Sequence, residues 1–166
     1  MVRQAHHERC IDKMSAQLKP NLSLRPMRED DLDAIMQIEP TIYSHPWTRG
    51  NFSDSLNSGY SAWVLESDDK MIGYALMMRV LDEAHLLNLS IVKTQQKQGL
   101  GRYLLEHMIE KAKQFQATNM FLEVRPSNVS AITLYENMGF CEMAVRRGYY
   151  PAKEGREDAV LMGLAL

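Results

Sequence analysis

The six residues from Gln96 to Gly101 (QKQGLG) constrain the fold more than any other segment of the chain. They lie between an apolar run at 86–92 and a helical pattern at 102–115. A strand, a glycine loop and a helix in this order bind anions, because the loop amides and the positive end of the helix dipole converge on one point. Gly99 lets the chain turn there. The segment predicts a phosphate-bearing cofactor; the alternative is a tight turn that only opens a helix.

Two nucleotide-binding motifs do not fit this loop. A P-loop requires Lys and then Ser or Thr directly after its second glycine, and the residues after Gly101 are Arg102 and Tyr103. The dinucleotide motif requires a third glycine, and Tyr103 and Leu104 occupy that region. The identity of the cofactor therefore has to come from other parts of the chain.

The amino-acid composition is typical of an ordinary globular domain. The chain has 166 residues, of which 45% are hydrophobic, and this is enough for one domain with a real core. The net charge of −2 gives no basic surface for nucleic acid, and no apolar run approaches the roughly 18 residues of a membrane span. Cys10 and Cys141 lack metal-type spacing, so we predict no metal and a reduced, cytoplasmic protein, with one disulfide left open.

Residues 1–20 differ from the rest of the chain. They contain His6, His7 and scattered charges, without a sustained apolar period or the apolar stretch of a signal peptide. We predict that residues 1–20 are an N-terminal extension, in which residues 1–13 are dispensable or belong to a start assigned too early, with Met14 as a second possible start. Residues 21–166 are predicted to form the single folded domain.

The pattern from Leu22 onward predicts strands alternating with helices. Acidic residues open the first helix, Pro40 ends it or marks its exit, and Thr48 caps the second. The expected order is β-α-α-β-β-β-α-β-α-β-β, an α+β fold with a mixed, mostly antiparallel sheet and helices on both faces. The predicted strands are 22–25, 61–66, 71–80, 84–92, 119–124, 141–147 and 158–164. The first two predicted helices begin near 28 and directly after Thr48, and the other two span 102–115 and about 130–138.

At this point the chain resembles a known family. QKQGLG matches the Q/R-x-x-G-x-G/A loop of GNAT-fold N-acetyltransferases, and the element order is similar from Leu22 to the end. Further segments resemble the RimI-type ribosomal-protein-alanine N-acetyltransferases. These segments are Leu122–Arg125 with Ser127 and Asn128, Leu134–Phe140, Arg146–Pro151 with Gly155–Ala159, Pro46–Trp47 and Leu81–Ala84.

The resemblance implies acetyl-CoA as the acetyl donor. In this fold the loop amides hold the pyrophosphate of coenzyme A, a strand lies beside its pantetheine arm, and one further side chain contacts it. The matching positions are Lys97, Gln98, Gly99, Leu100, Gly101 and Arg102 for the pyrophosphate, Leu89, Ser90 and Ile91 for the arm, and Asn128 for the further contact.

Glu123 is the candidate general base. The acceptor amine, with a pKa of roughly 7.7–8.0, must lose a proton before or during attack on the thioester. Glu123 lies in an otherwise apolar strand, so partial burial would raise the pKa of its carboxyl group. The alternative is a surface glutamate paired with Arg125.

Tyr135 is the candidate general acid. Its phenol, with an ordinary pKa of about 10, suits protonation of a thiolate leaving group. It lies two helical turns after Asn128, so both side chains can face the cofactor. The alternative is an aromatic packed in the core. Cys141 opens a strand without an obvious nearby His, so we expect a buried structural thiol there.

The substrate is implied by the resemblance alone. The family acetylates the N-terminal alanine of small-subunit ribosomal protein eighteen, and acidic or aromatic side chains near the cleft would suit its basic N-terminus. Solvated loop charges are the alternative for the acidic residues, and core or rim packing for the aromatic ones. The candidates are Glu39, Asp82, Glu83, Trp47, Tyr149 and Tyr150.

The predicted activity is acetyl transfer from acetyl-CoA to a protein N-terminal α-amine. One alternative keeps the chemistry and changes the acceptor to a lysine side chain, a small amine or a broad set of N-termini. Another, from a different class, is a non-catalytic module that binds coenzyme A or docks on the ribosome. We expect a monomer or weak dimer, without direct contact to nucleic acid or a membrane.

Overall fold

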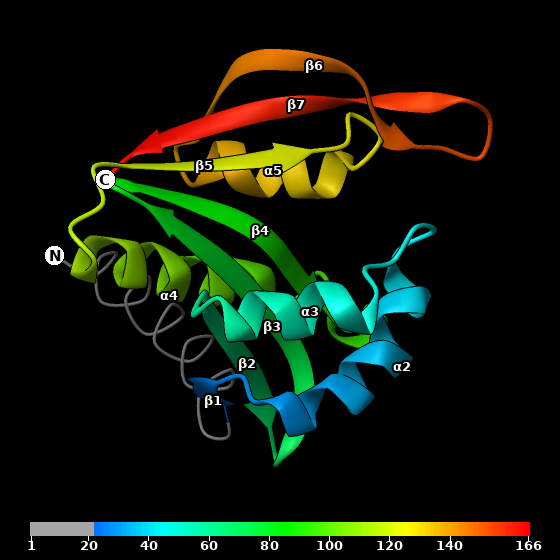
Figure 1. The fold of residues 1–166 in the computed structure, drawn as a ribbon, viewed down its shortest axis with the longest axis vertical. Coiled ribbons are helices and arrows are strands. Elements are labelled where there is room, and N and C mark those ends of the chain that lie inside the picture. Colours follow the sequence, from blue (N-terminus) through cyan, green and yellow to red (C-terminus); the bar gives the residue numbers. More distant parts are fainter. Residues whose placement is uncertain (1–21) are drawn as a thin grey trace, which may run out of the picture.

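The computed structural model describes residues 22–166 (Figure 1). The predicted extension at 1–20 lies outside the described residues. No helix in the described part is long and apolar enough to cross a membrane. The strands are β1 (Leu22–Pro26), β2 (Ser61–Ser67), β3 (Lys70–Val80), β4 (Glu83–Ile91), β5 (Asn119–Val124), β6 (Cys141–Pro151) and β7 (Arg156–Ala165). The helices are η1 (Glu29–Asp31), α2 (Leu32–Ile42), α3 (Arg49–Asn57), η2 (Lys93–Gln95), α4 (Leu100–Gln114) and α5 (Val129–Asn137).

The strands form one sheet in the order β1-β2-β3-β4-β5-β7-β6. Among the strands that the structure describes, only β4 and β5 pair in parallel, because α4 carries the chain back across the sheet between them. All other neighbouring strands are antiparallel. The predicted element order and the mixed, mostly antiparallel sheet are confirmed.

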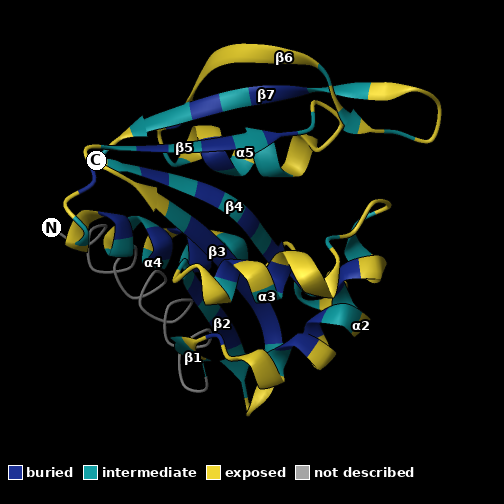
Figure 2. Cartoon of the chain, in the orientation of Figure 1, coloured by how far each residue is buried: buried dark blue, intermediate teal, exposed yellow. Residues whose placement is uncertain are grey.

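Two hydrophobic cores cover the two faces of the sheet (Figure 2). On one face α4 packs its fully buried Leu104 and Met108 against β3, β4 and β5. On the other face α2 and α3 contribute Leu32, Ile35 and Phe52. The apolar residues of these helices recur at helical spacing, so each helix buries one stripe. Helices therefore cover both faces, as predicted.

The sheet opens into a V between β4 and β5. The two strands pair only from Glu83 and Asn119 to Leu86 and Leu122, and then diverge (Figure 1). The rest of β4, as far as Ile91, stays paired with β3 but has no strand from residues 22–166 on its other side. Strands β5, β7 and β6 and helix α5 form one arm of the V, which we call the C-terminal arm.

Several local predictions are confirmed and others are corrected. Thr48 caps α3, accepting a hydrogen bond from the amide of Asn51. Pro40 does not end α2, which continues to Ile42; a proline keeps a helical φ and removes only the bond from its own nitrogen. Cys141 is exposed rather than buried, because β6 is the edge strand and is exposed along most of its length (Figure 2).

Candidate active site

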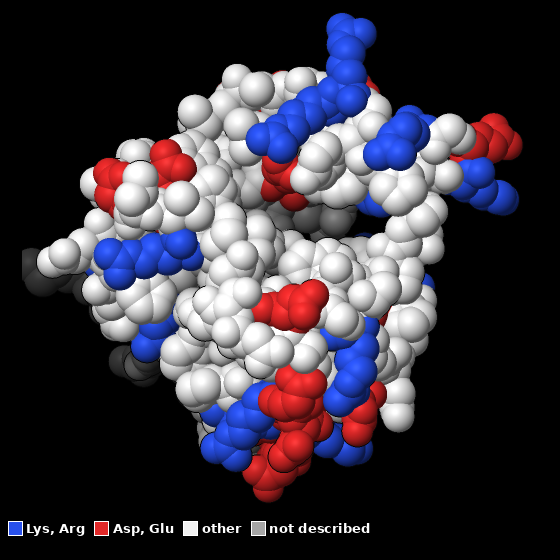
Figure 3. Space-filling view, viewed as in Figure 1, with Lys and Arg blue, Asp and Glu red and all other residues white. Residues whose placement is uncertain are grey.

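Two adjoining cavities lie in the V of the sheet. Cavity A has a volume of about 520 Å³ and is lined by β4, the glycine loop, the start of α4 and the start of α5. Cavity B, of about 350 Å³, is lined by the α2–α3 connection, the facing parts of β4 and β5, α5 and the end of β6. Tyr43, Leu89 and Asn128 are among the residues that line both. Figure 3 shows the hollow between the C-terminal arm and the rest of the molecule, with Lys and Arg side chains over the arm.

The open edge of β4 forms one wall of cavity A. The carbonyl of Ile91 accepts a hydrogen bond from Gln96 Nε2 at 2.9 Å, and the carbonyl of Leu89 lies 3.3 Å from the Tyr43 hydroxyl. These carbonyls therefore point away from β3, and the N–H of the same residue in a strand points the same way. The amides of Leu89 and Ile91 thus face the V, where an extended ligand can pair with them.

The glycine loop closes the end of cavity A. Lys97 and Gly99 both have left-handed backbone conformations, with φ of 59° and 81°, and Gly99 is the N-cap of α4. This geometry turns successive amides toward one point at the positive end of a helix, where an anion binds. The predicted turn at Gly99 is therefore present, and α4 begins at Leu100, two residues earlier than expected.

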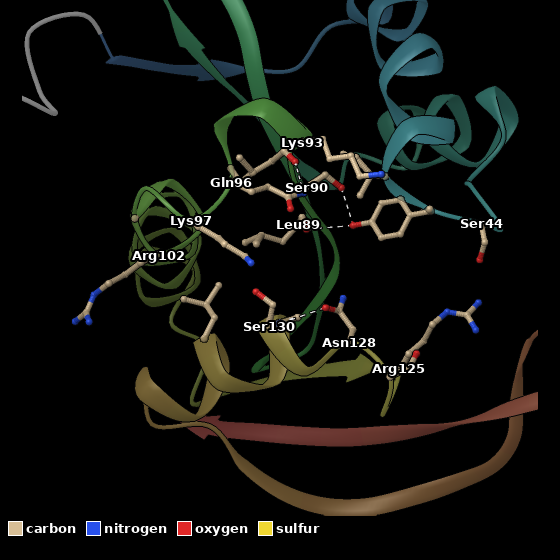
Figure 4. A pocket seen from close by; sticks show the side chains of 18 of the residues that line it. Ser44, Leu89, Ser90, Lys93, Gln96, Lys97, Arg102, Arg125, Asn128 and Ser130 are labelled. Atoms are coloured by element: carbon tan, nitrogen blue, oxygen red, sulfur yellow. Dashed lines mark hydrogen bonds between the residues drawn. The ribbon is translucent and has the colours of Figure 1, made fainter.

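The charge around cavity A suits a phosphate. Its lining contains four cationic residues, and no acidic one among the residues that the structure describes. The Lys97 side chain extends toward the cavity, whereas Arg102 points away from it (Figure 4). Arg102 instead bonds Glu106 at 2.9 Å, so only its backbone, at the start of α4, faces the anion position. The four cations are Lys93, Lys97, Arg102 and Arg125.

Eight of the ten predicted cofactor-binding residues come together around this cavity. They are Leu89, Ser90, Ile91, Lys97, Gly99, Gly101, Arg102 and Asn128. Gln98 and Leu100 do not line it, and the Leu100 side chain packs in the core. Asn128 caps α5, accepting a hydrogen bond from the amide of Ala131 at 3.2 Å (Figure 4). Its side chain therefore has a fixed position between the two cavities.

Glu123 lines cavity B from β5. Its side chain is 22% exposed, and Oε1 lies 2.8 Å from Nη1 of Arg146. The alternative pairing with Arg125 is wrong. Arg125 follows the end of β5 and bonds Glu157 at 3.1 Å, together with the carbonyl of Pro151.

Tyr135 lines cavity B from α5. It is buried, with its ring 5.7 Å from that of Phe140. Burial raises the pKa of the Tyr135 phenol far above its ordinary value, and the nearby Tyr43 and Tyr150 add to the shift. The phenol is thus both packed in the core and accessible from the cavity, and it stays protonated at neutral pH.

The six predicted substrate-binding residues are divided by the structure. Glu39, Trp47 and Tyr150 line cavity B. Asp82 and Glu83 do not, because they precede β4 or begin it, and the cavities lie toward its other end. Tyr149 is 41% exposed and lies outside both linings; its ring meets that of Tyr150 edge-on, with the centroids 4.9 Å apart. Trp47 also packs 5.2 Å from the ring of Phe52, so its core contacts are real as well.

Tyr43 lines both cavities and was missed by the sequence reasoning. Its hydroxyl lies 2.8 Å from Ser90 Oγ and 3.3 Å from the Leu89 carbonyl (Figure 4). Burial raises the pKa of Tyr43 to about 12. No motif marks this residue. Its position depends on the continuation of α2 beyond Pro40, which the pattern did not predict.

Comparisons with known proteins agree with this geometry. The profile of the acetyltransferase (GNAT) family matches residues 32–140. The ribosomal protein bS18-alanine N-acetyltransferase of Escherichia coli strain K12 is 40% identical over 144 residues, which cover 87% of this chain and 97% of that protein.

Two solved structures have the same fold. The crystal structure of the ribosomal-protein-S18-alanine N-acetyltransferase from Escherichia coli has a TM-score of 0.82 at 40% identity, covering 87% of this chain and 93% of that one. A putative acetyltransferase from Salmonella typhimurium, solved with its cofactor acetyl-CoA, shares the fold with a TM-score of 0.73 at 21% identity, covering 88% and 94%. This chain therefore belongs to the GNAT family of acetyltransferases.

Proposed function

We propose that this acetyltransferase moves an acetyl group from acetyl-CoA to the N-terminal α-amine of a protein, and that the N-terminal alanine of ribosomal protein bS18 is its substrate. The observation that carries the proposal is the junction of the two cavities: the cationic cavity A adjoins cavity B, and Glu123 and Tyr135 both line cavity B. The choice of acceptor is supported by the 40% identity to the ribosomal protein bS18-alanine N-acetyltransferase of Escherichia coli. The site of action would be the cytoplasm.

The residues of cavity A fit coenzyme A. Amides at Lys97, Gly99 and Gly101 would hold the pyrophosphate, helped by the positive end of α4. The amides of Leu89 and Ile91, which face the V, would pair with the pantetheine arm, and Asn128 would hold its far side. When bound, acetyl-CoA supplies the acetyl thioester that the amine attacks.

Glu123 is proposed to take the proton from the attacking amine, directly or through a water. The carboxylate lies on the wall of the acceptor cavity and is only partly shielded from water. The amine nitrogen forms a bond to the acetyl carbon, the bond from that carbon to sulfur breaks, and the amine proton passes to Glu123.

Tyr135 is proposed to give its phenol proton to the departing sulfur. Because burial keeps the phenol neutral, its proton is available throughout the pH range in which the amine is reactive. Glu39, Trp47 and Tyr150 are proposed to surround the acceptor N-terminus, and no covalent enzyme intermediate is required. Membership of an acetyltransferase family argues against the non-catalytic module.

The acceptor is tested with purified protein, acetyl-CoA and two short peptides. One begins Ala-Arg with a free amine; the other has a blocked amine and an internal lysine. Mass spectrometry reads which peptide gains an acetyl group, and enzyme lacking acetyl-CoA is the control. Acetylation of the alanine peptide alone supports the proposal. Acetylation of the lysine peptide alone overturns the acceptor, and transfer to neither shifts the proposal to a small amine.

A further inference from the structure

A fully buried carboxylate lines the acceptor cavity and has no cationic partner within residues 22–166. Glu39, on α2, is 0% exposed and lines cavity B. Its Oε1 accepts hydrogen bonds from the Tyr74 hydroxyl at 3.1 Å and from Asn88 Nδ2 at 3.0 Å. Its Oε2 is buried and has no hydrogen-bond partner of normal geometry within residues 22–166, although the backbone amide of Trp47 lies near the carboxylate.

The orientation of this carboxylate is set by a chain of hydrogen bonds. Asn88 donates to Glu39 through Nδ2 and accepts from Ser90 Oγ through Oδ1, at 2.7 Å. Ser90 Oγ in turn lies 2.8 Å from the hydroxyl of Tyr43. With both lone-pair positions of Oε1 occupied, Oε2 is the oxygen left to accept a further bond.

A buried hydrogen-bond acceptor without a donor lowers the stability of the folded protein unless a ligand supplies the donor. Apart from the nearby Trp47 amide, a donor for Oε2 has to come from a molecule that enters cavity B. The acceptor substrate carries such a donor at the atom that reacts, because an α-amino group has two or three N–H bonds. Glu123 and Tyr135 line the same cavity, so an amine held there lies among the groups proposed to act on it.

We propose that Oε2 of Glu39 accepts a hydrogen bond from the α-amino group of the incoming polypeptide and thereby selects free N-termini. The inference rests on the proposed function and adds a specific recognition contact to it. Acetylation turns the amine into a neutral amide with a single N–H, so the same contact weakens in the product. Glu39 would then favour substrate over product in cavity B.

The test measures the affinity of two peptides for the wild-type protein and for Glu39→Gln. Both proteins are loaded with coenzyme A, which carries no acetyl group, so that no transfer takes place. One peptide begins with alanine; the other begins with a propionyl group, which replaces the amine by hydrogen. Glu39→Gln retains an oxygen for Tyr74 and Asn88 and places a donor where Oε2 was. Calorimetry should show that wild type prefers the amine peptide by about tenfold or more, as expected for a hydrogen bond to a charged group. In Glu39→Gln the two affinities should agree within about twofold.

Tyr74→Phe is the matched control, since it removes a bond to Oε1 and leaves Oε2 in place. It should keep the preference for the amine peptide. If Glu39→Gln lost affinity for both peptides equally, the role of Glu39 would be structural and the inference would be overturned. A wild-type protein without the preference would overturn it too, and this measurement needs no variant. If wild type still acetylates the alanine peptide in either case, the proposed function stands while the inference fails.

Discussion

Nη1 of Arg146 lies 2.8 Å from Oε1 of Glu123, and the pair spans β7, the strand between β5 and β6. The ion pair holds the carboxylate at the wall of cavity B, where Glu123 would otherwise be free to rotate. The ring of Tyr149 lies over the same guanidinium, 5.6 Å from it. The C-terminal arm therefore positions the proposed base from two strands.

Replacing Glu123 by Gln should reduce kcat by about 10²- to 10⁴-fold, the usual contribution of general base catalysis. Gln is nearly isosteric with Glu but cannot take the proton. The affinity for acetyl-CoA should stay within about twofold, because Glu123 does not line cavity A. Steady-state kinetics with the alanine peptide measure the first quantity and calorimetry the second.

Glu142→Gln is a suitable control for that variant. Glu142 is an exposed glutamate on the same arm and lines neither cavity, so its replacement should leave kcat unchanged. If Glu123→Gln turned over like wild type, Glu123 would not be the base.

The rate at high pH should show that the Tyr135 phenol stays protonated. Because burial raises the pKa of this phenol, the proton donor is not lost as the pH passes the ordinary tyrosine value. We expect kcat/KM to rise through about pH 8 as the peptide amine deprotonates, and to remain flat to about pH 10. Tyr135→Phe should lower the plateau and keep the rising limb. A decline of the wild-type rate beginning near pH 9 and missing in Tyr135→Phe would argue against this.

Gly73→Ala should destabilise the protein by about 1–3 kcal/mol through overpacking. A Cβ at this position would lie 2.7 Å from Ile91 Cδ1 and 2.8 Å from the carbonyl oxygen of Ser90, and this second atom belongs to the backbone. Since both neighbours line cavity A, the affinity for acetyl-CoA should fall as well. Urea unfolding and calorimetry measure the two effects.

Gly50→Ala provides the contrast for Gly73→Ala. Gly50 lies in α3 with its nearest atom 3.6 Å from the Cβ position, so alanine should stabilise the helix by about 0.5–1 kcal/mol. Equal effects from the two substitutions would show that the close contact at Gly73 is relieved at no cost.

Glu39→Gln should stabilise the protein at neutral pH. Burial raises the pKa of the Glu39 carboxyl group in the folded state, so the folded protein binds this proton more tightly than the unfolded chain. The contribution of Glu39 to stability is present below its unfolded pKa of about 4.3 and is lost as the pH rises through the folded pKa. The advantage of the variant should therefore grow as the pH is raised from about 4 to 8, as measured by urea unfolding. A constant difference between the proteins would contradict the shift.

The chain's own pattern was sufficient for the order and kind of the elements. Apolar periodicity, turn residues and the cap at Thr48 act over a few residues, so they can be recognised locally. The glycine loop and the motifs around Glu123, Asn128 and Tyr135 also lie in short segments, and they marked the walls of both cavities. These predictions needed no knowledge of how distant strands pair.

The remaining features were decided by the tertiary structure. Arg146 pairs with Glu123 because the sheet places β6 one strand away from β5, with β7 between them, and the arginine side chain reaches across β7. Asp82 and Glu83 lie away from the cavities because they are at the start of β4, and the cavities are toward its other end. Glu39 is buried because α2 packs against the sheet, where it meets residues 35 and 49 positions later in the chain. Sequence spacing alone does not specify which face or end of a sheet a residue occupies, and contacts over such separations follow from that placement.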